Sequence, residues 1–89
     1  STPSVDNYIN LSLAYYKAGL YKDCIETCEK ALKLDPKNAT AYNNMCSAFC
    51  GLKEWAKAES ACQKALQIDP NFELAKNNLS WAQGELKAK

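Results

Sequence analysis

The chain repeats itself every 34 residues, and this period constrains its fold more than any other feature of the sequence. Identical residues recur at this spacing in the pairs Tyr8 and Tyr42, Asn10 and Asn44, Cys28 and Cys62, Ala31 and Ala65, and Pro36 and Pro70. A third copy begins at Glu73 and stops halfway. Self-similarity at a fixed period of this size is typical of a solenoid of stacked supersecondary units. We therefore expect an extended surface for contacts with other proteins.

Within each copy, the apolar residues follow a helical pattern that is interrupted by turns. Tyr8, Leu11 and Tyr15 lie at positions i, i+3 and i+7, which share one face of a helix. An Asp-Pro pair closes the second and the fourth helical segment, because proline lacks the N–H and pushes the preceding residue out of the α region. The pattern predicts five helices and no strand, at about residues 4–18, 21–34, 39–51, 54–68 and 72–87.

Charge and length exclude several classes of partner. The 89 residues carry 11 Lys or Arg and 10 Asp or Glu, a net charge of +1 with no run of one sign. This balance argues against nucleic acid or an anionic membrane as the main partner. No stretch approaches the ~20 apolar residues of a membrane span. The chain starts without Met, so we expect a fragment of a longer protein. Its many unpaired thiols suggest a reducing compartment, so we expect a cytoplasmic location.

The sequence offers little material for catalysis or for a cofactor. It has no His, no Gly-rich phosphate loop and no evident pair of carboxylates. The five cysteines include the i,i+4 pairs Cys24/Cys28 and Cys46/Cys50, which share a helix face. Structural zinc sites favour closer spacings in loops, and the thiols lack a basic partner that would activate them. We expect reduced, metal-free cysteines that act as small core residues, and no enzymatic activity.

These residues resemble the tetratricopeptide repeat. The family pattern W-x2-L-G-x2-Y…A-x3-F…P appears as Tyr8-x2-Leu11-Ser12-x2-Tyr15…Cys24-x3-Cys28…Pro36 and recurs as Tyr42-x2-Met45-Cys46-x2-Phe49…Ala58-x3-Cys62…Pro70. The resemblance implies an all-α, right-handed superhelical solenoid of antiparallel helix pairs. It divides one domain (1–89) into repeat 1 (5–38), repeat 2 (39–72) and a capping half-repeat (73–89), in which polar Lys76 and Gln83 replace the aromatic positions and Leu79, Ser80 and Ala82 face inward.

In this family, the first helix of each unit lines a concave groove that holds peptides, so the resemblance implies a protein-interaction module. The candidate peptide-binding residues are Ile9, Asn10, Leu13, Asn43, Asn44, Ser47, Leu74, Asn77, Asn78 and Trp81. Asn10, Asn44 and Asn78 stand in register, similar to the Asn ladder of the O-linked N-acetylglucosamine transferases that grips peptide backbones. An Asn amide offers both a donor and an acceptor to a peptide unit. The alternative is that these Asn side chains order neighbouring helices through hydrogen bonds.

The resemblance raises one further ligand class and one alternative function. The two-carboxylate clamp that holds Hsp90 and Hsp70 tails needs cations, whereas Ile9, Leu13 and Leu74 occupy three of its five positions, so we predict that such tails do not bind. The alternative function is assembly: Val5, Tyr8 and Tyr15 would form an apolar end that stacks on another copy and gives a homo-oligomer.

Overall fold

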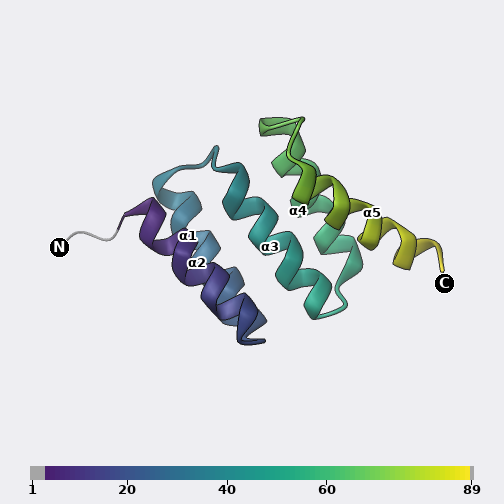
Figure 1. The fold of residues 1–89 in the computed structure, drawn as a ribbon, viewed down its shortest axis with the longest axis horizontal. Helices are drawn as coiled ribbons and strands as arrows, with labels where there is room; N and C mark the ends of the chain where they lie inside the picture. The colour runs from purple at the N-terminus through teal and green to yellow at the C-terminus, as the bar shows by residue number, and fades with distance from the viewer. Residues whose placement is uncertain (1–3, 89) are drawn as a thin grey trace.

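A computed structural model describes residues 4–88, and in this range the chain forms five α-helices and no strand (Figure 1). The helices are α1 (Val5–Lys17), α2 (Tyr21–Leu34), α3 (Ala39–Gly51), α4 (Trp55–Ile68) and α5 (Glu73–Lys87). Each boundary lies within one residue of the prediction, so the reading of the helical pattern is confirmed.

Local side chains explain where two of the helices begin. Ser4 Oγ accepts a hydrogen bond from the Asn7 amide at 3.2 Å and caps α1. Asn38 Oδ1 accepts from the Ala41 amide at 2.9 Å and caps α3 in the same way. Each cap satisfies an amide that has no partner inside its own helix.

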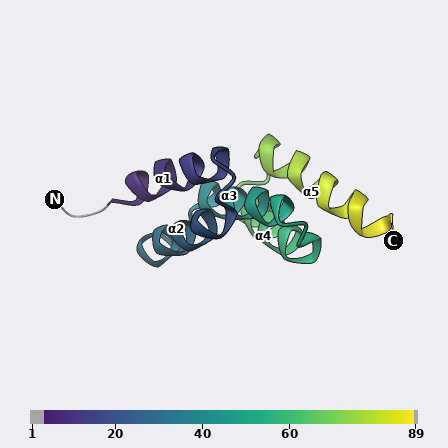
Figure 2. The same cartoon turned by 90° about the horizontal axis from the view of Figure 1, so that it is seen from below.

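The five helices are arranged in two layers (Figure 2). Helices α1, α3 and α5 form one layer, in which α1 contacts α3 and α3 contacts α5. Helices α2 and α4 form the other layer, and within residues 4–88 no contact joins them. In a curved solenoid, neighbouring helices lie closer together on the inner side of the curve than on its outer side. The inner, concave side of the solenoid is therefore lined by α1, α3 and α5, and α2 and α4 diverge on the convex side.

Small side chains fill the core between the paired helices. Ala31 and Ala65 are fully buried, as are the cysteines of α2. Met45 packs against both buried clusters and so links repeat 1 to repeat 2. Small residues let helix backbones approach closely, so this core is thin and any increase in volume meets a neighbouring helix.

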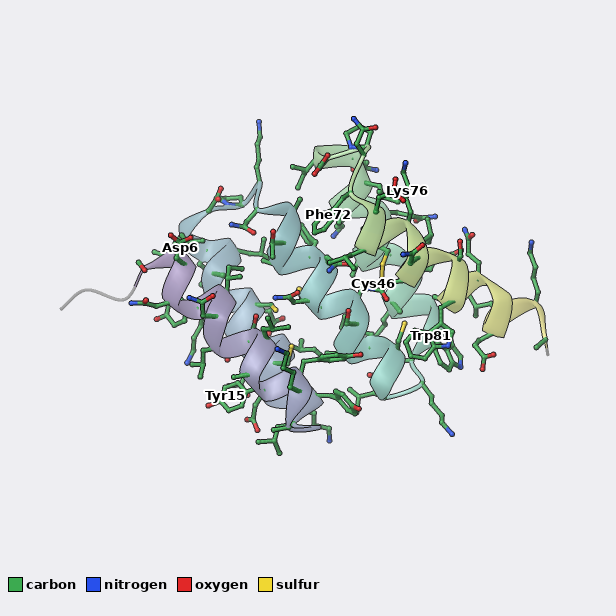
Figure 3. All side chains as sticks on the ribbon, viewed as in Figure 1. Asp6, Tyr15, Cys46, Phe72, Lys76 and Trp81 are labelled. Atoms are coloured by element: carbon green, nitrogen blue, oxygen red, sulfur yellow. A yellow bond between two sulfur atoms is a disulfide. The ribbon has the colours of Figure 1, made fainter. Side chains whose placement is uncertain are left out.

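The prediction that all five cysteines are reduced is wrong for two of them. Cys46 of α3 and Cys62 of α4 form a disulfide, the yellow bond beside Cys46 in Figure 3. Their Cα atoms are 5.5 Å apart, inside the range of about 4.4–6.8 Å that a disulfide requires. Because the paired helices α3 and α4 approach closely, two cysteines 16 residues apart meet. The i,i+4 pairs within one helix do not form this bond. Cys24, Cys28 and Cys50 are buried free thiols.

Polar contacts occupy the outer side of helix α5. Lys76 forms an ion pair with Glu73 at 3.6 Å, and Gln83 Nε2 donates a hydrogen bond to Glu59 Oε2 at 3.2 Å. Of the three residues expected to face inward, Ala82 is buried and Leu79 packs against the core, but Ser80 is exposed. That part of the prediction is wrong. Between residues 4 and 88 no helix has the length and apolar character needed to cross a membrane.

Candidate peptide-binding groove

All ten residues that the sequence selected for peptide binding belong to the three helices of the concave layer. They are Ile9, Asn10 and Leu13 on α1; Asn43, Asn44 and Ser47 on α3; and Leu74, Asn77, Asn78 and Trp81 on α5. Their exposure differs strongly, and this difference separates side chains that brace the groove from side chains that can meet a ligand.

Asn44 joins α3 to α1. Its side chain is 8% exposed, and its Nδ2 donates a hydrogen bond to Ser12 Oγ at 3.1 Å. Ser12 is itself fully buried and donates to the Ile9 carbonyl at 2.7 Å. The Asn44 side chain is therefore turned towards α1 and not towards solvent, which agrees with the alternative that Asn orders neighbouring helices. The spacing of 34 located this residue, but its partner becomes visible only when the two helices are packed together.

Asn78 joins α5 to α3 through a different pair of contacts. Its Nδ2 donates to Asn43 Oδ1 at 3.0 Å and to Ser47 Oγ at 2.9 Å. In repeat 2, the place of Ser12 is taken by Cys46, whose sulfur is held in the disulfide. No hydroxyl is available there, so Asn78 bonds to its neighbours on α3 instead. Two rungs of the Asn ladder thus brace adjacent helices.

Asn10 and Asn77 remain available to a ligand. Both side chains are exposed, and neither forms a side-chain hydrogen bond with any residue between 4 and 88. They lie on α1 and α5, the two outer walls of the groove. Each amide can donate to a peptide carbonyl and accept from a peptide N–H.

The groove walls also expose large apolar side chains. Leu13 is 41% exposed on α1, and Leu74 is 62% exposed on α5. Trp81 is 46% exposed and packs against the buried Trp55, with ring centroids 5.5 Å apart and planes inclined by 57°. Exposed apolar groups gathered on a concave face mark a contact surface. Apolar surface and free amides are therefore what this face offers to a ligand.

The proposed self-association surface lies on α1, the first helix of the fold. Val5, Tyr8 and Tyr15 are each half-buried, and Tyr15 packs against the cysteine cluster of α2. Figure 3 shows Tyr15 on the side of α1 away from α3. Leu11, which the helical pattern places on the same face as the two tyrosines, is 43% exposed but was not among the residues selected for self-association. Stacking through this surface stays a prediction.

The free thiols lie too deep for chemistry on an external substrate. Cys24 and Cys28 are 0% exposed and Cys50 is 2% exposed. The hydrogen bond with Cys28, together with burial, raises the pKa of Cys24, and the same bond lowers the pKa of Cys28 while burial opposes that shift. Burial raises the pKa of Cys50 from 9.0 to about 11, so this thiol is neutral at pH 7. No group of ligating residues within 4–88 could hold a metal ion.

Models of the tetratricopeptide repeat match residues 5–38 and 39–72. RNA polymerase II-associated protein 3 of Xenopus tropicalis is 44% identical over 46 residues, which are 52% of this chain and 7% of the relative. The Hsp70/Hsp90 co-chaperone CNS1 of Saccharomyces cerevisiae is 38% identical over 54 residues, 61% of this chain and 14% of the relative. The chain thus spans a small part of both relatives.

Two solved structures share the fold. The first TPR of Spaghetti (RPAP3), bound to the HSP90 peptide SRMEEVD, is 27% identical with a TM-score of 0.91, covering 96% of this chain and 68% of that one. The second TPR domain of human RPAP3, in complex with the HSP70 peptide SGPTIEEVD, is 22% identical with a TM-score of 0.85, covering 90% and 67%.

These complexes correct the exclusion of chaperone tails. Both structural neighbours hold peptides from Hsp90 or Hsp70, and one curated relative is an Hsp70/Hsp90 co-chaperone. The prediction that chaperone tails do not bind compared this chain with the five positions of the carboxylate clamp, and it rested on the missing cations. A peptide in a groove also makes main-chain and apolar contacts, which that comparison left out. The exclusion is therefore wrong.

Proposed function

Because this chain belongs to the tetratricopeptide repeat family, we propose that it is a non-catalytic module that binds an extended peptide segment of a partner protein in the groove of α1, α3 and α5. The observation that carries the proposal is the likeness to the first TPR of Spaghetti, which holds such a peptide. The fully buried thiols and the lack of His support the non-catalytic part.

In this proposal, some groove residues bind the main chain of the peptide and others bind its side chains. Asn10 and Asn77 supply free amides for peptide units on the two walls of the groove. Leu13, Leu74 and Trp81 supply exposed apolar surface. Asn44 and Asn78 act earlier, because their hydrogen bonds fix the spacing of the three helices before a peptide arrives.

Tails that end in Glu-Glu-Val-Asp are the ligand class that we propose. The Met and Val of SRMEEVD match the apolar walls, and the main chain matches the free amides. The tail carboxylates meet no cation at Leu13 or Leu74, so their contribution is small and binding should depend weakly on salt.

The proposal is tested by introducing a lysine at one of these apolar positions. We expect Leu13→Lys to raise the affinity for fluorescently labelled SRMEEVD about 2–5-fold, the range of an exposed ion pair, and to steepen its dependence on salt. Leu34→Lys is the matched control, because Leu34 is exposed on α2, outside the groove. Fluorescence anisotropy at two salt concentrations gives both quantities.

Two outcomes would contradict the proposal. One is the absence of binding of SRMEEVD and SGPTIEEVD up to about 1 mM, which is the weakest interaction such a titration follows. The other is an equal gain from Leu34→Lys, which would mean that net charge, and not the groove, attracts the peptide.

We place the protein in the cytoplasm as part of the same proposal. Three free thiols agree with a reducing compartment, whereas the disulfide between Cys46 and Cys62 favours an oxidising one. Trapping thiols with acid at the moment of cell lysis measures which state the native protein holds. An oxidised pair in the trapped protein would count against the cytoplasm.

A further inference from the structure

A cleft of about 190 Å³ lies between α3 and α4, outside the peptide groove. Tyr42, Met45 and Phe49 line it from α3, and Lys57, Ser60, Ala61 and Lys64 line it from α4. At 3.6 residues per turn, the Tyr42–Met45–Phe49 stripe points about 180° away from the Asn43–Asn44–Ser47 face of the same helix. The cleft therefore belongs to the convex side, where α2 and α4 diverge.

The floor of the cleft is apolar and belongs to the core. Ala61 is 6% exposed, and Met45 packs against both buried clusters. Ligand pockets for drug-sized molecules measure about 300–1,000 Å³, so this smaller cleft fits one side chain better than a cofactor.

The rim of the cleft carries two cations over aromatic rings. Lys57 Nζ lies 6.0 Å from the centroid of the Phe49 ring, and Lys64 Nζ lies 5.7 Å from that of Tyr42. Seven residues along α4 separate the two lysines by about 10 Å. Lys57 also pairs with Glu54 at 3.3 Å, whereas Lys64 has no carboxylate partner among residues 4–88.

Repeat 1 shows that this basic rim is not a general property of the fold. The residues 34 positions earlier, which hold the places of Lys57 and Ser60, are Asp23 and Glu26. Only Lys64 keeps its charge, as Lys30. The same structural place is thus acidic in repeat 1 and basic in repeat 2, so the charge at the cleft is specific to repeat 2.

We propose that this cleft is a second binding site, which takes a short segment of a partner protein with an apolar side chain between two acidic residues. The apolar side chain fills the space over Met45 and Ala61. The flanking carboxylates reach Lys57 and Lys64, which an extended chain spans with about three residues, at ~3.3 Å each. Opposite charges at the rim fix orientation and register more than they add affinity.

The probe is the pentapeptide Asp-Glu-Phe-Glu-Asp, acetylated and amidated so that it has no terminal carboxylate. We expect it to shift the backbone amide signals of Met45 and Ala61 in a titration of the ¹⁵N-labelled chain. The double variant Lys57→Glu/Lys64→Glu should weaken binding about 3–10-fold, since two exposed ion pairs become repulsions. Lys22→Glu/Lys30→Glu is the matched control, with the same change of net charge on the exposed side of α2.

Three outcomes would overturn the proposal: no binding up to about 1 mM, an equal loss in the control, or shifts confined to α1 and α5. Sedimentation of the chain without peptide covers a further case. A concentration-dependent dimer that Lys57→Glu/Lys64→Glu abolishes would identify the occupant as a second copy and reject a partner segment. Binding of SRMEEVD to the same double variant reports on the groove separately, so the two proposals fail independently.

Discussion

At the scale of single residues, Asn44 and Asn78 of the concave face form hydrogen bonds between helices. The Asn44 side chain is buried against Ser12, and each supplies a hydrogen-bond partner that water would otherwise provide. Removal of one partner leaves the other buried and unpaired, which costs more than the bond itself contributes.

We therefore expect Asn44→Ala to lower the free energy of unfolding by about 1–3 kcal/mol. Asn10→Ala removes an exposed amide at the same repeat position and should change it by no more than about 0.5 kcal/mol. Urea denaturation followed by circular dichroism gives both values. Equal stability of the two variants would show that the contact with Ser12 does not support the fold.

The sequence could place these amides but could not assign their partners. A period of 34 puts Asn10, Asn44 and Asn78 at equivalent positions of three repeats, and they lie on α1, α3 and α5. Whether an amide meets a hydroxyl or a disulfide depends on the residue opposite it, Ser12 in one repeat and Cys46 in the next. Periodicity gives the direction of a side chain, whereas its partner follows from distances across the packed helices.

At the scale of the helices, the close packing of each pair depends on alanine. Ala31 of α2 and Ala65 of α4 hold the same repeat position, and both are fully buried. A larger side chain there must push two helices apart or leave its preferred rotamer.

Replacing either alanine with leucine should therefore lower the free energy of unfolding by roughly 1–3 kcal/mol. Ala56→Leu, on the exposed side of α4, is the control and should be nearly neutral. Denaturant midpoints of the three variants measure the difference. An unchanged midpoint for both buried variants would mean that the pairs have room that the structure does not show.

The helix boundaries were predictable because local chemistry sets them. An Asp-Pro pair follows α2 and another follows α4. Ser4 caps the start of α1, and Asn38 caps the start of α3. One local feature was hidden: Lys53 has a φ of 60°, at the place where repeat 1 uses Gly19 with a φ of 79°. The fold imposes this left-handed turn on a residue that does not favour it.

At the scale of the whole molecule, the disulfide makes the two repeats unequal. It joins α3 to α4 within repeat 2, whereas repeat 1 has Ser12 opposite Cys28 and no covalent link. Closing a loop of this size restricts the unfolded chain and stabilises the fold by about 3 kcal/mol.

The expected thiol count tests this asymmetry. In denaturant without a reductant, iodoacetamide should label Cys24, Cys28 and Cys50 only, and after reduction it should label all five cysteines. Reduction should also lower the free energy of unfolding by about 2–4 kcal/mol, and the double variant Cys46→Ala/Cys62→Ala should not respond to the reductant. Mass spectrometry counts the labels. Five labels without reductant would disprove the crosslink.

Helices α2 and α4 do not contact each other within residues 4–88, and both pack on α3. Because α3 contacts all four other helices, any change in the angle between the two repeats must take place at the surfaces of this one helix. The molecule is long and thin, 47 × 27 × 17 Å, so a small change of angle at α3 becomes a larger displacement at its ends. Those ends are α1 and α5, the two outer walls of the proposed groove. The distance between these two walls therefore depends on how the other helices pack on α3.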